Sequence, residues 1–174
     1  GMSKGDYDLK QLADLVDRPG ITGDSIAEYS SICPGKPAIA FCVNIAHAEH
    51  VCAQFASAGY RSSVVHGKMS LDEIRKGIDG LLDGSIQILW AVDLISEVTD
   101  IIQAVVAINL RKTASLALHV QQGGRILRPI YAEGFDLSTR AGRLDAIAAS
   151  PKPKAIILDH VSNYAKHYLI DEPH

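Results

Sequence analysis

Short runs of apolar residues alternate along the chain with longer stretches in which apolar residues recur every three or four positions. The runs have the length of strands, and their continuous hydrophobicity is typical of strands buried on both faces of a parallel sheet. The longer stretches are bounded by capping residues, glycine and proline, as helices are. The predicted strands are 38–43, 61–66, 85–92, 104–110 and 154–161, and the predicted helices are 7–17, 22–31, 46–58, 70–83, 114–122 and 138–149.

The order of these elements predicts the fold. Strands that alternate with helices at this spacing are typical of an α/β domain with a mostly parallel central sheet and helices on both faces. Ligands of such domains bind beyond the carboxyl ends of the strands. The candidate functional residues are therefore those that follow the predicted strands: Asn44, His66 with Gly67, the segments 93–100 and 111–113, and Asp159.

Composition narrows the class of protein. The 174 residues, 47% hydrophobic and 21% charged, are enough for one folded domain with a short extension. The 17 basic and 20 acidic residues give a net charge of −3, which excludes a polybasic protein that binds nucleic acid through net charge alone. Three cysteines without metal-ligand spacing favour a reducing compartment, and no apolar run is long enough for a membrane span. We therefore expect a cytoplasmic protein without a membrane partner.

The most specific motif is the segment 121–129, QQGGRILRP. The predicted helix stops at its glycine pair, and Arg125 and Arg128 then lie three residues apart on one side of a helical turn. Guanidinium groups bind phosphate oxygens through paired hydrogen bonds, and the glycines would let a phosphate or a neighbouring backbone approach closely. On spacing alone, a solvent-exposed arginine pair after a glycine helix cap explains the motif equally well.

The pattern Q-x-x-G-R-x-x-R followed by proline resembles motif VI of superfamily-two helicases, in particular the DEAD/DEAH-box-like group. Three further segments occur in the order found in that family. Residues 39–44 (IAFCVN) are similar to motif IV, His66-Gly67 to the turn before the next helix, and residues 93–101 (DLISEVTDI) to motif V. The resemblance covers about residues 38–129 and implies the second RecA-like domain of a nucleic-acid-dependent ATPase, a three-layer fold like that of P-loop NTPases.

The resemblance implies a cleft between two domains of one protein. The phosphate-binding loop and the acidic magnesium motif of these enzymes belong to the first RecA-like domain, and this sequence contains neither. ATP and Mg²⁺ would be bound mainly by that absent domain, so we expect no hydrolysis by this chain alone. The residues implied at the nucleotide are Arg125 and Arg128 as arginine fingers, Gln121 beside them, Asp100 at the ribose, and Glu97 and Gly124.

A DNA or RNA strand is the second implied partner. Asn44, Gly67, Lys68 and Thr99 are candidates to donate hydrogen bonds to its phosphates, a contact that positions a strand without reading its sequence. Two simpler interpretations stay open. Asn44 has the position of a helix N-cap, which is compatible with phosphate binding, and Lys68 has that of a solvent-exposed turn residue.

Several positions depart from the family pattern. Val98 stands where relatives usually carry glycine, Val92 where they often carry a hydroxyl residue, and Ile102 where proline is common. These differences keep an alternative open, namely a stand-alone nucleic-acid-binding or regulatory module that kept the fold without ATPase activity. We divide the chain into a helical lead-in, residues 1–35, and the RecA-like domain, residues 36–170, with an insert at 131–154.

Two other groups of residues have simpler interpretations. His47 and His50 lie three apart on a predicted helix with His66 in reach, but a third convincing metal ligand is missing, so no metal site is predicted. Asp159-His160 ends a strand at the functional edge, where it has either a catalytic role or the task of fixing the last helix. A dinucleotide-binding or phosphorelay domain is disfavoured, because Asn44 and a segment without glycine follow the first strand.

Overall fold

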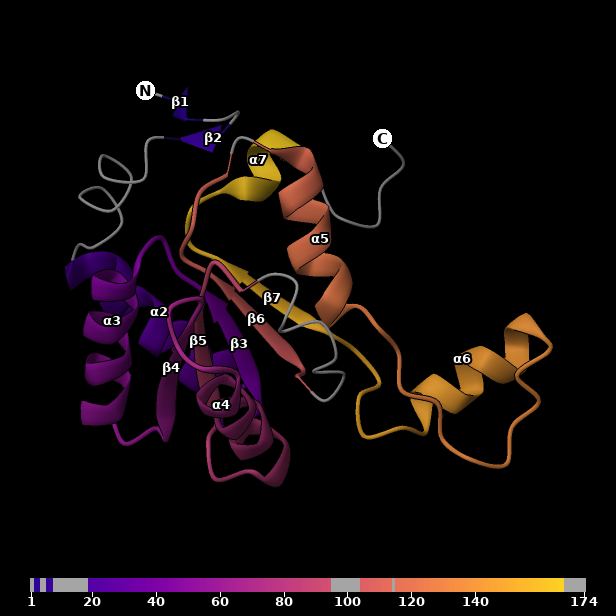
Figure 1. Ribbon diagram of the computed structural model, residues 1–174. Coiled ribbons are helices and arrows are strands. Elements are labelled where there is room, and N and C mark those ends of the chain that lie inside the picture. The colour runs from indigo at the N-terminus through magenta and orange to yellow at the C-terminus, as the bar shows by residue number, and fades with distance from the viewer. Residues whose placement is uncertain (1, 4–5, 8–18, 95–103, 114, 168–174) are drawn as a thin grey trace.

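The computed structural model describes residues 2–3, 6–7, 19–94, 104–113 and 115–167, and Figure 1 shows the arrangement of their elements. A five-stranded sheet has strands of four or five residues, and among the described residues four of these strands are followed directly by a helix. The strands are β3 (Ala38–Phe41), β4 (Ser62–His66), β5 (Ile88–Val92), β6 (Val106–Asn109) and β7 (Ile156–Asp159). The helices are α2 (Pro19–Ile32), α3 (Ile45–Ser57), α4 (Leu71–Asp83), α5 (Leu116–Ile126), α6 (Arg140–Ala148) and α7 (Asn163–His167).

All neighbouring strands of this sheet run parallel, in the order β4-β5-β3-β6-β7. β3 is central, and Ala38 is in register with Ile88 of β5 and Val106 of β6. Its four residues are buried, as the continuous apolar run predicts. Because parallel strands end at the same edge, the loops after β3, β4 and β5 lie together at one end of the sheet.

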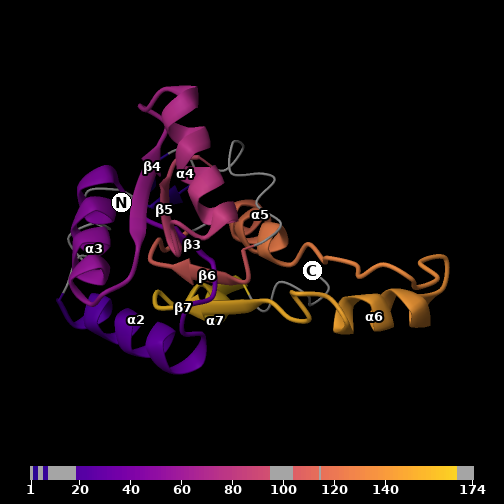
Figure 2. The same ribbon diagram turned by 90° about the horizontal axis from the view of Figure 1, so that it is seen from below.

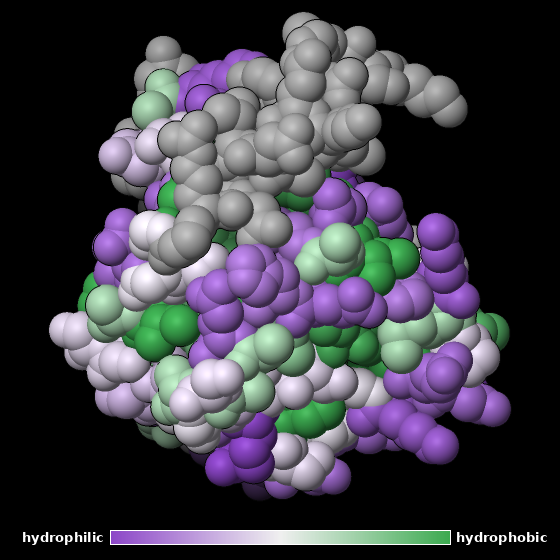
Figure 3. Space-filling model, turned by 90° about the vertical axis from the view of Figure 1, so that its left-hand side faces the viewer, coloured by the Kyte–Doolittle hydropathy of each residue, from purple (hydrophilic) through white to green (hydrophobic). Residues whose placement is uncertain are grey.

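Helices cover both faces of the sheet (Figures 1 and 2). Tyr29 of α2 and Phe55 of α3 pack on one face around Trp90, whose ring lies 4.8 Å from that of Phe55. Ile74 of α4 and Ile126 of α5 pack on the other face. The three-layer α/β architecture predicted from the sequence is therefore confirmed. On the side that contains α3, hydrophobic residues form only small separate patches (Figure 3).

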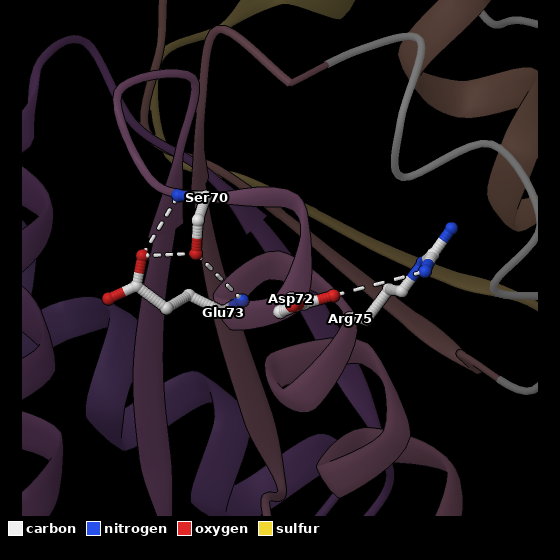
Figure 4. Close-up of polar contacts among 4 residues, drawn as sticks. All are labelled: Ser70, Asp72, Glu73 and Arg75. Carbon is white, nitrogen blue, oxygen red and sulfur yellow. Dashed lines mark hydrogen bonds and ion pairs between the residues drawn. The ribbon is translucent and has the colours of Figure 1, made fainter.

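The start of α4 follows directly from its sequence. The hydroxyl of Ser70 accepts a hydrogen bond from the Glu73 backbone N–H at 3.3 Å, and the Glu73 carboxylate accepts one from the Ser70 backbone N–H at 2.8 Å (Figure 4). Together these two bonds form a capping box, for which the sequence S-L-D-E of residues 70–73 is typical. Hydrogen bonds from the Ser70 hydroxyl and backbone also hold the pKa of Glu73 below its usual range. Gly84 ends the helix with a φ of 81°, which favours glycine.

Three predicted helix boundaries are wrong. α2 begins at Pro19 rather than near residue 22, because the fixed φ of proline suits the first position of a helix. α5 continues through Gly123 and Gly124 to Ile126 instead of stopping at the glycine pair. The predicted helix at 7–17 starts inside β2 (Asp6–Tyr7), which pairs antiparallel with β1 (Met2–Ser3), and its remaining residues lie outside the described part.

Residues 130–154, here called the arm, project from the body between α5 and β7 and include α6 (Figures 1 and 2). Thr139 caps α6 by accepting a hydrogen bond from the Gly142 backbone N–H at 3.0 Å. Arg143 donates to the carbonyl oxygens of Leu137 and Ser138, and the Ala132 backbone N–H donates to the Ala146 carbonyl. The arm is thus held in shape mainly by contacts among its own residues.

Two helical glycines give a matched test of this packing. A methyl group at Gly77 of α4 would lie 2.6 Å from the Val65 side chain, whereas one at Gly23 of α2 would meet nothing within 4 Å. We expect Gly77→Ala to lower the free energy of unfolding by about 1–3 kcal/mol through overpacking. Gly23→Ala should raise it by about 0.5–1 kcal/mol, because alanine loses less backbone entropy in a helix. Urea unfolding of both variants measures the difference, and equal changes would contradict the packing of α4 on β4.

Candidate nucleic-acid interface

A pocket of about 560 Å³ opens at the carboxyl ends of three neighbouring strands, β4, β5 and β3. Three of the four residues proposed from sequence to contact nucleic acid, Asn44, Gly67 and Lys68, lie together in its wall. The fourth, Thr99, lies outside the described residues. The lining consists of Val43, Asn44, Ile45, Ala46, His66, Gly67, Lys68, Val92 and Asp93.

The first helical turn of α3 forms one wall of the pocket. Asn44 precedes the helix in an extended conformation, and its Oδ1 accepts a hydrogen bond from the His47 backbone N–H at 2.8 Å. The N-cap interpretation is therefore confirmed, and the cap uses the side-chain oxygen of a residue that also lines the pocket. The first N–H groups of a helix lack helical partners and carry the positive end of the helix dipole, so this wall favours an anion.

The loop after β4 forms the second wall. Gly67 and Lys68 are exposed, and a methyl group at Gly67 would lie 3.9 Å from the Asp93 carbonyl oxygen of the neighbouring loop. The Lys68 backbone N–H donates to Nδ1 of His66 at 3.3 Å. A ring nitrogen that accepts carries no proton, so this contact fixes the His66 proton on Nε2. The wall therefore offers an exposed glycine backbone and a lysine ammonium group.

The loop after β5 brings a carboxylate to the pocket. Asp93 has a φ of 54°, a left-handed conformation that is uncommon outside glycine. Its Oδ1 accepts a hydrogen bond at 2.8 Å from the guanidinium of Arg111, whose side chain is only 11% exposed. This cation offsets the negative charge that would otherwise repel a phosphate from the pocket. Val92 is buried and gives the wall an apolar patch where relatives often carry a hydroxyl group.

The arginine motif lies on and just beyond α5, which packs on the opposite face of the sheet from α3. Gln121 and Gly124 are exposed on one face of the helix, whereas His119, Gln122 and Ile126 are buried on the opposite face. A methyl group at Gly124 would meet nothing within 4 Å, so the backbone there is open to approach.

Of the two arginines of the motif, the structure describes the side chain of Arg128 but not that of Arg125. Arg128 follows the helix and is exposed. Arg125 lies in the last turn of α5, but its side chain is outside the described part. Asp100, implied at the ribose, and Glu97, implied at the nucleotide, lie outside the described residues, as do Val98 and Ile102.

Sequence reasoning missed a group of buried polar residues behind the site. Arg111 and Thr113 lie in a segment that we singled out without assigning a role, and Asn163 and His167 of α7 were not considered. Their contacts join distant parts of the chain; Asn163, for example, bonds to Arg111, 52 residues earlier in the sequence. No local sequence pattern indicates such a contact.

Asp159 has a structural role in the described contacts. Its Oδ2 accepts a hydrogen bond from the Tyr164 backbone N–H at 2.9 Å, which fixes the start of α7. His160 lies 3.5 Å from the Glu28 carboxylate, and burial keeps its pKa below the usual value although Glu28 opposes that effect. The interpretation that these residues fix the last helix is therefore confirmed for Asp159.

Among the described residues, no three His, Cys, Asp or Glu side chains lie close enough together to hold a metal ion. His47 is buried in the core, and Nε2 of His50 instead contacts the Gln54 amide at 2.7 Å. None of the helices in that part of the chain is both long and apolar enough to cross a membrane.

Comparison with known proteins gives a family match over most of the sheet. The model of the helicase conserved C-terminal domain matches residues 24–129. A 51.5 kDa protein of a Lactococcus phage is 29% identical over 173 residues, which are 99% of this chain and 34% of the phage protein. The ATP-dependent RNA helicase drs1 of Aspergillus terreus is 29% identical over 102 residues, 59% of this chain and 11% of that helicase. The chain thus spans about a third or less of these relatives.

Solved structures support the same fold at low identity. The C-terminal domain of the DEAD-box protein Dbp5 has a TM-score of 0.54 at 18% identity, covering 87% of this chain and 76% of that one. The DEAD-box protein SrmB of E. coli, solved with the regulator of ribonuclease activity A, has a TM-score of 0.56 at 17% identity, covering 87% and 71%. At these identities the likeness establishes the fold.

The Asp93–Arg111 pair at the pocket gives a prediction about stability. Asp93→Ala should lower the free energy of unfolding by about 2 kcal/mol, about half from the lost charge-assisted hydrogen bond and half from alanine at positive φ. Asp93→Gly removes the same pair without the backbone cost and should recover about 1 kcal/mol.

The control is Asp72→Ala, since Asp72 and Arg75 form an exposed pair at 3.9 Å (Figure 4) and such pairs contribute little. Thermal unfolding compares the three variants. An Asp93→Ala variant as stable as Asp72→Ala would contradict a stabilising role of the pair.

Proposed function

The chain belongs to the helicase conserved C-terminal domain family, and on this premise we propose that it is the C-terminal motor domain of an ATP-dependent DNA or RNA helicase or translocase. In this proposal it works with a first RecA-like domain of the same protein. It contributes part of the nucleic-acid track and the arginine fingers of the ATP site. The length of the relatives, of which this chain spans a third or less, supports a second domain.

The pocket at the ends of β4, β5 and β3 carries this proposal. It combines the positive end of α3, the Asn44 amide, an exposed glycine backbone and the Lys68 ammonium group. These are donors suited to phosphate oxygens, and none of them reads a base edge. The geometry therefore supports binding of a nucleic-acid backbone, with little dependence on base sequence.

The ATP side of the proposal rests on the exposed face of α5 and the residues after it. ATP with Mg²⁺, when bound between the domains, supplies the phosphoryl group whose transfer drives the motor. Arg125 and Arg128 would place positive charge beside the phosphates, and Gln121 would orient them. The open backbone at Gly124 fits such a ligand, because no side chain fills the space there. Asp100 would contact the ribose, and Glu97 is a further candidate for contact with the nucleotide.

One observation favours a second candidate function, a stand-alone module without ATPase activity. The buried apolar side chain of Val92 in the pocket wall removes a hydroxyl donor that relatives often have there. A stand-alone module that binds nucleic acid or regulates another protein, without ATPase activity, is consistent with that loss. The complete reading frame distinguishes the two, because a motor requires a phosphate-binding loop and an acidic magnesium motif upstream.

The arginine fingers give the first test. The chain alone should hydrolyse no ATP above background, because it lacks the phosphate-binding loop. In the polypeptide of the complete reading frame, Arg125→Ala should lower nucleic-acid-stimulated ATP turnover on the order of 10³-fold, the usual contribution of an arginine finger. Arg143→Ala is the matched control, since that arginine bonds within the arm. Turnover by Arg125→Ala within about twofold of the control, at saturating nucleic acid, would rule out the finger assignment.

Asn44 separates helix capping from phosphate binding. Asn44→Ser and Asn44→Asp both keep a cap, so we expect unfolding free energies within about 0.5 kcal/mol of each other. The aspartate adds a negative charge at the pocket and should weaken binding of a labelled oligonucleotide by about tenfold at low salt, whereas the serine variant should bind within about threefold of wild type. Fluorescence anisotropy at several salt concentrations measures this. Equal affinity of both variants would place the strand elsewhere.

A further inference from the structure

Buried polar side chains form a continuous link behind the candidate site. Asn163, Thr113, His119, His167 and Arg111 are each at most 9% exposed, in a region between the pocket and α5. Buried polar groups of this kind are costly unless they are hydrogen-bonded, so their partners show what holds them in place.

Asn163 of α7 holds the backbone that connects β6 to α5. Its Nδ2 donates to the Arg111 carbonyl at 3.0 Å, and its Oδ1 accepts from the Thr113 backbone N–H at 3.0 Å. One side-chain amide thus satisfies both backbone groups of this turn, and the two bonds fix the amide's orientation. A displacement of residues 111–113 has to move α7 as well or break a buried hydrogen bond.

His167 continues the link from this turn to α5. Its Nε2 lies 2.9 Å from the Thr113 carbonyl oxygen, which can only accept, so Nε2 carries the proton. The His167 ring stacks on that of His119, with ring centres 5.3 Å apart and an angle of 28° between the planes. His119 lies on the buried face of α5, opposite the exposed Gln121 and Gly124.

At its other end the link reaches the pocket. The Arg111 guanidinium bonds the Asp93 carboxylate at 2.8 Å. Asp93 follows β5 and Arg111 follows β6, and these strands are separated by β3, so the arginine side chain crosses the carboxyl end of the central strand. An interstrand spacing of about 4.8 Å makes this crossing about 10 Å wide, which a long side chain can span.

We propose that Asn163 and His167 are positioning residues that couple the nucleic-acid pocket to α5, through Arg111 and Asp93 on one side and His119 on the other. The inference rests on the proposed function, in which the pocket binds nucleic acid and the exposed face of α5 contacts ATP. α7 lies beyond residue 129, where the family match ends, so Asn163 and His167 lie outside the matched segment, whereas Asp93, Arg111 and His119 lie inside it. A strand that contacts the Asp93 wall would thereby shift the helix that carries the motif residues.

The contact chain is tested first without any ligand. Ring signals of His119 and His167 are followed by NMR in Asp93→Asn, with Asp72→Asn as the control on an exposed pair. We expect Asp93→Asn to shift both ring signals and the Gln121 and Gly124 amide signals, and the control to leave them in place. The same Asp93 change made in an Asn163→Ala background should no longer reach His119. If Asp93→Asn and Asp72→Asn had the same effect on the His119 and His167 ring signals, the inference would be overturned.

A titration with nucleic acid distinguishes failure of the coupling from failure of the proposed function. Titration with oligo(dT) or oligo(U) should shift the amide signals of Gly67 and Lys68 in the wild type and in Asn163→Ala. The His119 ring signal should shift in the wild type only. Shifts confined to the pocket would overturn the coupling and leave the function intact. A titration in which no signal moves would overturn the function and, with it, the coupling to a bound strand.

Variants of His167 show whether the hydrogen bond itself matters. His167→Gln keeps an N–H donor for the Thr113 carbonyl and should bind the oligonucleotide within about twofold of wild type. His167→Leu keeps the volume without the donor and should bind about fivefold more weakly, a loss typical of one broken link in a hydrogen-bond network. Circular dichroism and urea unfolding establish that both variants are folded. Equal affinities for the two folded variants would rule out a positioning role for His167.

Discussion

Parallel pairing of β3 on both of its edges is the constraint on which the rest of the molecule depends. Its four residues are at most 4% exposed, and both neighbouring strands align with it from Ala38 onward. β4 runs parallel to β5, so the first turn of α3 after β3, the His66 loop after β4 and Asp93 after β5 meet at one edge. The same pairing sets the distance that Arg111 has to cross to reach Asp93. The candidate interface is thus a consequence of strand direction.

Most of the fold could be predicted from local sequence, because apolar runs and capping residues report directly on strands and helix starts. The end of α5 was predicted wrongly because it depends on tertiary contacts. Two glycines, each about 1 kcal/mol less favourable than alanine in a helix, argued for a stop after residue 122. α5 continues because Gln122 and Ile126 are buried against the sheet. β3 and β6 end earlier than their apolar runs, because Val43 and Leu110 are buried in loops rather than paired in the sheet.

The candidate site was predictable to the extent that it lies at strand ends. Asn44, Gly67 and Lys68 come directly after predicted strands, and the parallel sheet brings them into one pocket. The support behind them was not predictable. Asn163 meets the Arg111 turn only after the chain has passed through α5, the arm and β7. A single sequence gives no indication that Asn163 and Arg111 are in contact, because they are far apart in the chain. Neither residue lies in a local pattern that would single it out.

The arm between α5 and β7 has a consequence for how this domain can vary. Its ends enter the body at α5 and β7, and its internal hydrogen bonds are made mostly among its own residues. Closing a longer loop costs only about 0.6 kcal/mol for each doubling of length. Residues can therefore be gained or lost in the arm with little effect on the pairing of β6 with β7. Evolution can change this part of the chain at nearly constant stability, independently of the sheet that holds the pocket.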